Sequence, residues 1–185
     1  MRPAIDIISA YPGWSAICQT AEGFAREAAE LALLRGSEAF GIAWSGPVEL
    51  SVKLVEAAEQ RRLNRDYRSR DKPTNVLAFP AWDPAAPLPP GLPVLLGDVV
   101  LDCETVAREA SEQDKSFADH LRHLVVHGVL HLLGYDHRTP GEAAEMEALE
   151  TAILAELGVP DPYRDTMSFT APQSLLSHER FRTAR

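Results

Sequence analysis

The sequence predicts an α+β domain in which helices pack on a small mixed β-sheet. Three observations support this prediction: strand-like runs are mixed with longer segments of helical periodicity, no repeat or interior linker divides the chain, and 185 residues suit one domain. Hydrophobic residues make up 45% and charged residues 24%, as in ordinary globular domains. We expect residues 1–163 to form a single domain and residues 164–185 to form a loosely ordered C-terminal tail.

The first part of the chain contains two strand-like and two helix-like segments. Residues 4–8 form a short apolar run that predicts a strand, and residues 14–34 place apolar side chains at helical spacing. Residues 48–54 alternate apolar and polar side chains, which is the period of a half-buried strand. A second helix is expected over residues 56–65, whereas residues 36–47 are ambiguous.

The second part predicts two buried strands and three further helices. Residues 75–79 and 94–101 are short apolar runs between turn residues, as buried strands usually are. Six prolines fall within residues 80–93, and this density removes hydrogen-bond donors and favours a surface loop. Helical spacing then predicts helices over residues 103–113, 117–133 and 141–157.

The cysteines and the first residues favour a cytoplasmic protein. Cys18 and Cys103 are far apart and show no CxxC spacing, so neither a disulfide framework nor a cysteine zinc site is indicated. Both are expected to be buried thiols. The first residues lack the apolar core of a signal peptide, and no apolar run has the length of a membrane span. We therefore expect no membrane partner.

The charge distribution points to one local contact with an anionic partner. The formal net charge of -9 argues against non-specific wrapping of nucleic acid, which needs concentrated positive charge. Residues 61–72, however, hold six basic and two acidic side chains, a local balance of +4. From charge alone, a solvated surface is an equally good interpretation of this segment.

The most specific signal is a group of three histidines around a glycine. His127 and His131 are four residues apart, so on a helix they lie on one face, one turn apart, and both can bind one ion. Gly134 suits the left-handed conformation that often ends a helix, which lets the chain turn and bring His137 to the same ion. Three imidazoles leave a fourth position open, as in catalytic rather than structural zinc sites.

The apolar surroundings favour a metal site over the alternative of hydrogen-bonded core histidines. Burying unpartnered imidazoles in an apolar helix costs free energy. The apolar residues lie on nearly all sides of the predicted helix and are Leu121, Leu124, Val125, Val126, Val129, Leu130, Leu132 and Leu133. A ligand such as a metal ion offsets that cost.

A second histidine pair competes with the first. His123 is also four residues from His127, but it is eight residues from His131, roughly 12 Å along a straight helix, too far to share one ion readily. The glycine break and His137 favour His131 as the ligand. His120 and His123 are interpreted as neighbours of the metal ligands, substrate-side groups or satisfied polar residues.

Gly128 occupies the position where the HExxH motif of metallopeptidases has its glutamate base. A peptidase mechanism that relies on this glutamate is therefore excluded. Glycine inside a helix costs about 1 kcal/mol relative to alanine, which suggests a specific need for a small residue. The need is either close approach of substrate or backbone, or tight helix packing.

A second candidate segment, residues 63–80, runs from a helix through a basic loop into a strand. Arginine carries a planar, permanently charged guanidinium that matches phosphate oxygens. An arginine beside a metal ion can bind a phosphodiester and stabilise its developing charge. The candidate RNA contacts in this segment are Arg65, Arg68, Arg70 and Lys72.

Together the two segments resemble the YbeY family of bacterial ribosomal RNA maturation endoribonucleases. The resemblance rests on four runs in the expected order over roughly residues 48–163. These are Asn64 with Tyr67 and Arg68 followed by DKPTNVLAFP at 71–80, LGD at 96–98, HGVLHLLGYDH at 127–137, and EME at 145–147. The amino-terminal part, the proline-rich loop and the tail beyond Arg164 match loosely or not at all.

The resemblance implies a function as well as a fold. It implies a metal-dependent endoribonuclease, selective for single strands, that acts in 3′-end maturation of 16S ribosomal RNA and in ribosome quality control. It also implies one Zn²⁺ per chain on His127, His131 and His137, with Arg68 and His127 needed for cleavage. The implied partners are ribosomal RNA, the small ribosomal subunit and its proteins; DNA is not expected.

Two other functions compete with this prediction. One is a different zinc hydrolase acting on peptides or small molecules, against which the absent glutamate and the basic segment argue. The other is a non-catalytic ribosome-assembly or RNA-binding factor in which the metal only clamps the helix to its loop. The open coordination position argues against that second alternative.

Overall fold

The computed structural model describes residues 3–88 and 90–164 and contains a four-stranded mixed sheet with strand order β1-β2-β4-β3. The strands are β1 (Ala4–Ser9), β2 (Val48–Val55), β3 (Val76–Pro80) and β4 (Val94–Asp102). β1, β2 and β4 are mutually parallel, whereas β3 is an edge strand antiparallel to β4. The predicted α+β fold with a small mixed sheet is confirmed.

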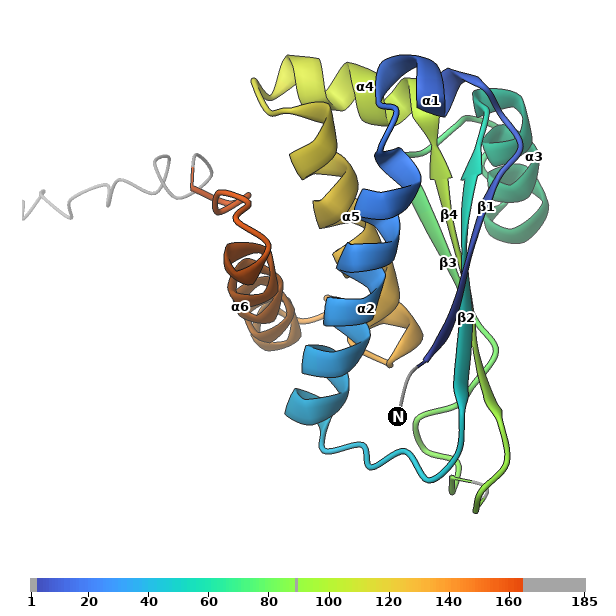
Figure 1. Ribbon diagram of the computed structural model, residues 1–185, viewed down its shortest axis with the longest axis vertical. Helices are drawn as coiled ribbons and strands as arrows, with labels where there is room; N and C mark the ends of the chain where they lie inside the picture. Colours follow the sequence, from blue (N-terminus) through green and yellow to red (C-terminus); the bar gives the residue numbers. More distant parts are fainter. Residues whose placement is uncertain (1–2, 89, 165–185) are drawn as a thin grey trace, which may run out of the picture.

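Helices cover the sheet unequally (Figure 1). They are α1 (Gly13–Ile17), α2 (Ala21–Phe40), α3 (Ala57–Arg68), α4 (Cys103–Glu112), α5 (Phe117–Leu132) and α6 (Pro140–Glu156). α2 and α5 pack on one face of the sheet with α6 outside them, and α3 lies on the opposite face. The sheet therefore separates α5, which carries His127, from α3, which carries Arg68.

The core lies between the sheet and the pair of helices α2 and α5. Alternate residues of β2 and β4 point into it, among them Val52, Leu54 and Val99, all essentially inaccessible to solvent. α2 contributes small side chains that let it approach its neighbours closely. These are Ala21, Ala25, Ala28, Ala29 and Ala32, each no more than 2% exposed.

The structure differs from the sequence prediction in the first helix. The predicted helix over residues 14–34 is divided into α1 and α2, because Cys18 is extended, with φ -145° and ψ 103°. The Trp14 indole donates a hydrogen bond to the Val55 carbonyl at 3.0 Å, so α1 is tied to the end of β2. α2 then continues to Phe40 and ends at Gly41, whose φ is 73°.

The two cysteines have different environments. Cys103 is buried, and this burial raises the pKa of its thiol to about 12, so it stays an unreactive thiol. Cys18 is only half-buried, contrary to the expectation that both cysteines are buried.

Gly128 brings α5 close to the sheet. A Cβ atom at this position would lie 2.5 Å from Cγ1 and 3.1 Å from Cγ2 of Val99 on β4. Of the two interpretations of this glycine, tight helix packing is therefore the one that the contacts support. The same Cβ would lie 3.4 Å from Cγ2 of Val76, so the close packing also brings α5 near the edge strand β3.

Gly128→Ala should destabilise the metal-free protein by up to about 2 kcal/mol. Overpacking against a β-branched side chain costs about 1–3 kcal/mol, while alanine recovers about 1 kcal/mol of helix propensity. Urea unfolding measures this change. In the double variant Gly128→Ala with Val99→Ala, the loss should be smaller than the sum of the single losses, since Val99 no longer obstructs the new methyl group. Losses that simply add in the double variant contradict the packing account.

Two expectations concern the rest of the chain. No helix in residues 3–88 or 90–164 is both long enough and apolar enough to span a membrane. The C-terminal tail, residues 164–185, is expected to be loosely ordered. Its residues beyond Arg164 lie outside the described range.

Candidate metal centre

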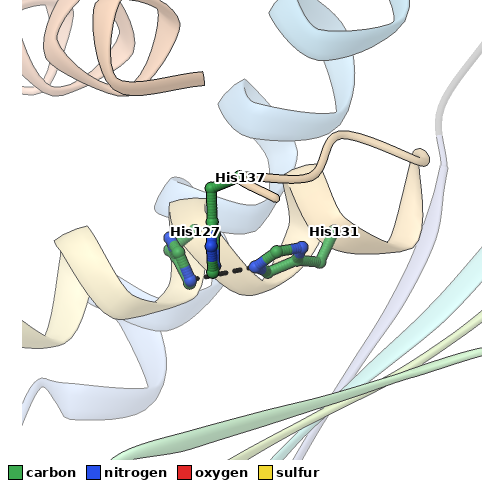
Figure 2. Close-up of side chains that lie close together, drawn as sticks. All are labelled: His127, His131 and His137. Carbon is green, nitrogen blue, oxygen red and sulfur yellow. Dashed lines mark hydrogen bonds between the residues drawn. The ribbon is translucent and has the colours of Figure 1, made fainter. Parts of the chain in front are cut away.

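The structure brings His127, His131 and His137 together at the carboxyl end of α5. Figure 2 shows the first two on neighbouring turns of the helix and the third on the loop that follows it. One ligand nitrogen from each ring lies within 4.8 Å of the others. His123 does not belong to this group, so of the two competing histidine pairs the structure assembles the later one.

Local sequence signals position the third histidine. α5 ends at Leu132, and Gly134 adopts a φ of 99°, a conformation that side chains other than glycine rarely adopt. A Cβ at Gly134 would also lie 2.4 Å from Cγ of Pro84 in the proline-rich loop. α6 begins shortly after His137 with a capping box formed by Thr139 and Glu142. The short loop that carries His137 thus lies between the glycine after the end of α5 and the capping box at the start of α6.

The hydrogen bonds of His127 and His131 determine which ring nitrogens carry protons. Nδ1 of His131 faces the Tyr135 carbonyl at 2.9 Å, and Nδ1 of His127 faces Oε1 of Glu150 at 2.7 Å. Both partners only accept hydrogen bonds, so both Nδ1 atoms are protonated. When such a ring is neutral, its Nε2 offers a lone pair that a metal ion can bind.

The two Nε2 atoms face each other. Nε2 of His127 and Nε2 of His131 are 3.0 Å apart, within hydrogen-bond distance (Figure 2). Nitrogens bound to one tetrahedral zinc ion lie at a similar separation, roughly 3.3 Å. Burial, together with the nearby His127, lowers the pKa of His131 to about 4, so this imidazole stays neutral near pH 7. The donor set fits a divalent metal ion.

Glu150 is a residue of the site that sequence reasoning missed. It is fully buried on α6, and its carboxylate contacts His127 and His123. Burial alone raises the pKa of Glu150, but its histidine hydrogen bonds outweigh burial and lower it to about 2. The signal was present in the sequence: Glu150 lies at helical spacing among Met146, Ile153 and Leu154, which form the buried face of α6.

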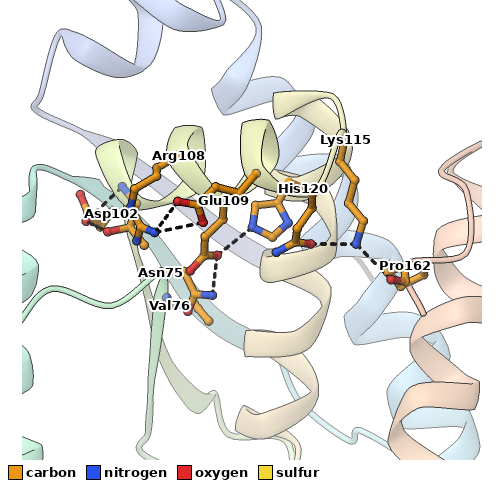
Figure 3. Close-up of polar contacts among 11 residues, drawn as sticks. Asn75, Val76, Asp102, Arg108, Glu109, Lys115, His120 and Pro162 are labelled. Atoms are coloured by element: carbon orange, nitrogen blue, oxygen red, sulfur yellow. Dashed lines mark hydrogen bonds and ion pairs between the residues drawn. The ribbon is translucent and has the colours of Figure 1, made fainter. Parts of the chain in front are cut away.

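A cavity of about 660 Å³ reaches the histidine group at His127, and His123 is also part of its wall. Its far side contains a polar chain in which Glu109 accepts hydrogen bonds from Asn75 and His120, both at 2.9 Å (Figure 3). His123 shares the Glu150 carboxylate with His127, so it is a neighbour of a candidate ligand, whereas His120 is a satisfied polar residue bonded to Glu109. Both are among the roles that the sequence left open.

The basic residues lie elsewhere. Arg68 is the last residue of α3 and, with Lys53, Tyr67 and Phe79, lines a separate hollow of about 590 Å³. Within the described part of the chain, no hydrogen bond or ion pair joins Arg68 to the three histidines. Arg68 pairs with neither of the nearby carboxylates, Asp66 and Asp71. Asp71 instead forms a two-pronged pair with Arg61, while Asp66 pairs with Arg65.

The other candidate RNA contacts lie on the same side as Arg68. Arg65, Arg70 and Lys72 are exposed around the end of α3 and the loop after it. The Asn64 side chain donates to the Lys72 carbonyl at 2.7 Å and so holds this loop against the helix. The structure thus collects the basic candidates on one surface and the histidines on another.

Comparison with known proteins decides the family. A family model described as Endoribonuclease YbeY matches residues 20–158, about three quarters of the chain. The chain belongs to the YbeY family. The Endoribonuclease YbeY of Rhodospirillum rubrum is 49% identical over 167 residues, covering 89% of this chain and 82% of that protein. The Endoribonuclease YbeY of Rhodopseudomonas palustris is 50% identical over 163 residues, covering 88% and 91%.

The YbeY match confirms the resemblance seen in the sequence. It begins at residue 20 and so includes residues 20–47, which lie before the runs that carry the resemblance. A solved structure, described as the solution structure of TM1509 from Thermotoga maritima, is 22% identical, with a TM-score of 0.49. That match covers 92% of this chain and 99% of the other.

Proposed function

We propose that this protein is a zinc-dependent endoribonuclease that cleaves single-stranded RNA in the maturation of the 3′ end of 16S ribosomal RNA and in ribosome quality control. The observation that carries the proposal is that Nε2 of His127 and Nε2 of His131 lie 3.0 Å apart, with His137 completing the group. Membership of a family whose relatives are described as endoribonucleases supports the reaction. The small ribosomal subunit and its proteins are the proposed partners, and the cytoplasm the proposed location.

The proposed ligands of one Zn²⁺ are His127, His131 and His137. Among the described residues, no fourth histidine, cysteine or carboxylate joins this group, which leaves a coordination position for the reaction. An ion held in this way supplies Lewis-acid activation of a phosphodiester and of its nucleophile. The protein side chains position it: Glu150 and the Tyr135 carbonyl accept the Nδ1 protons of His127 and His131.

The surroundings of the site favour RNA over a peptide substrate. Gly128 packs against Val99 where a metallopeptidase has its glutamate, so this position provides no base. The edge strand β3 borders both the histidine cavity, through Val76, and the hollow of Arg68, through Phe79. A single strand crossing the edge at β3 can therefore reach both surfaces.

The proposed RNA contacts are Arg65, Arg68, Arg70 and Lys72. Among the described residues, no ion pair involves Arg68, Arg70 or Lys72. Their charges are therefore available to phosphates. Arg65 is paired with Asp66 at 3.2 Å, but both side chains are about half exposed and such pairs are weak. This segment is therefore locally positive although the whole chain is acidic.

RNA binding should weaken with salt, and Arg65→Gln with Arg70→Gln should reduce that dependence. Each phosphate contact on a single strand contributes roughly 0.7 to the slope of log affinity against log salt, so losing two should lower it by about 1.4. Fluorescence anisotropy with a labelled single-stranded RNA measures the slope. Arg35→Gln on α2, whose partners are Glu38 and Glu156, is the control. Equal slopes in wild type and double variant contradict this interface.

A substrate panel tests the proposed function. Zinc-loaded protein is incubated with matched single-stranded RNA, double-stranded RNA, single-stranded DNA and an unstructured peptide. The proposal predicts internal cleavage of the single-stranded RNA alone. Peptide hydrolysis favours the other zinc hydrolase, and tight RNA binding with no cleavage favours the non-catalytic assembly factor.

A further inference from the structure

Glu150 is a buried carboxylate whose ion-pair partners in the described residues are histidines alone. Its side chain is 1% exposed, and it lies on α6, which packs against α5. A buried charge is costly unless several hydrogen bonds satisfy it. Three donors meet Glu150, and they are His127, His123 and the Tyr163 hydroxyl.

The two carboxylate oxygens have separate partners. Oε1 accepts from Nδ1 of His127 at 2.7 Å, on the side of the candidate metal ligands. Oε2 faces Nε2 of His123 at 3.1 Å and accepts from the Tyr163 hydroxyl, on the side of the adjoining cavity. The second pair of contacts prevents the carboxylate from turning away from His127.

We infer that Glu150 is a positioning residue that fixes His127 as a metal ligand, with Tyr163 and His123 anchoring its second oxygen. A carboxylate that accepts the far-side proton of a ligating imidazole fixes the tautomer, orients the ring and makes its free nitrogen more basic. This inference rests on the metal site of the proposed function but not on its RNA substrate. Zinc binding can therefore confirm it even if RNA cleavage fails.

A purely structural role is the alternative. On that account Glu150 only joins α6 to α5, and its replacement lowers the stability of the fold without changing the affinity of a folded molecule for metal. The positioning role instead predicts that a folded molecule binds metal more weakly, because the geometry and basicity of His127 depend on the carboxylate.

The test is zinc binding by metal-free protein, measured in competition with a chromophoric chelator. Glu150→Gln keeps the shape of the side chain but removes its charge, and it should weaken zinc binding by about 10- to 100-fold. Glu147→Gln is the matched control, since it lies one turn earlier on α6 and is exposed. It should bind zinc as the wild type does.

Ring-nitrogen NMR of the same metal-free proteins provides a second readout. The wild type should show His127 protonated at Nδ1, and Glu150→Gln should lose this uniform tautomer. A folded Glu150→Gln protein with wild-type zinc affinity and unchanged His127 signals overturns the inference.

Tyr163→Phe keeps the inference testable if Glu150→Gln does not fold. This change removes one anchor of Oε2 and leaves the carboxylate in place. Zinc affinity should fall by a smaller factor than expected for Glu150→Gln, with the unfolding temperature measured in parallel. Wild-type zinc affinity in folded Tyr163→Phe overturns the anchoring role.

Discussion

Replacing His131 and His137 together with alanine should abolish stoichiometric zinc binding and RNA cleavage. The double variant leaves His127 as one imidazole of the group, and one neutral nitrogen cannot hold an ion against solvent. Metal analysis after dialysis measures the zinc content, which should fall from one ion per chain to a trace. Cleavage of single-stranded RNA should fall with it.

His178→Ala is the control for this experiment. His178 lies outside the described residues and is not among the proposed ligands. Its replacement should leave both zinc content and cleavage unchanged. Full zinc occupancy in the double variant would contradict the assignment of His131 and His137 as ligands.

Arg68→Ala should slow RNA cleavage at saturating RNA by about 10²- to 10³-fold. This is the effect of losing one preorganised donor to a developing charge, about 2.7–4 kcal/mol of barrier. The cleavage rate is measured by single-turnover kinetics. The variant used is folded and loaded with zinc. Arg68→Lys should recover little, because a point charge cannot form two parallel hydrogen bonds to phosphate oxygens.

The position of Arg68 makes this a demanding prediction. Arg68 lies on α3, across the sheet from α5, so it reaches the reacting phosphate only if the RNA bends around β3. Arg62→Ala, an exposed change on the same helix, is the matched control and should cleave at the wild-type rate. If Arg68→Ala cleaves at the wild-type rate but binds RNA more weakly, Arg68 is an RNA anchor only.

Sequence reasoning could predict the histidine group because its geometry is local. The spacing of His127 and His131 follows from one turn of helix, and the position of His137 follows from a glycine that ends the helix. Both depend on fewer than a dozen consecutive residues. The helix predicted over residues 117–133 is observed as α5, Phe117–Leu132. The two differ by one residue, because the signals that define this helix are also local.

The parts that the sequence did not predict depend on tertiary packing. Glu150 meets His127 only because α6 folds back along α5, and the spacing of the two residues contains no direct sign of that contact. The separation of Arg68 from the histidines depends on which face of the sheet α3 covers. The break at Cys18 was missed because apolar spacing continues through it, while the Trp14 contact with Val55 lies 41 residues away.

The most direct measurement is cleavage of one single-stranded RNA by the same protein in three states. These are zinc-loaded, stripped with a chelator, and stripped and then reloaded with one equivalent of zinc. We expect internal cleavage in the first state, none in the second and recovery in the third, with no recovery in the His131→Ala, His137→Ala variant. Undiminished cleavage by the stripped wild-type protein, or by the double variant, would contradict a metal-dependent endoribonuclease built on these three histidines.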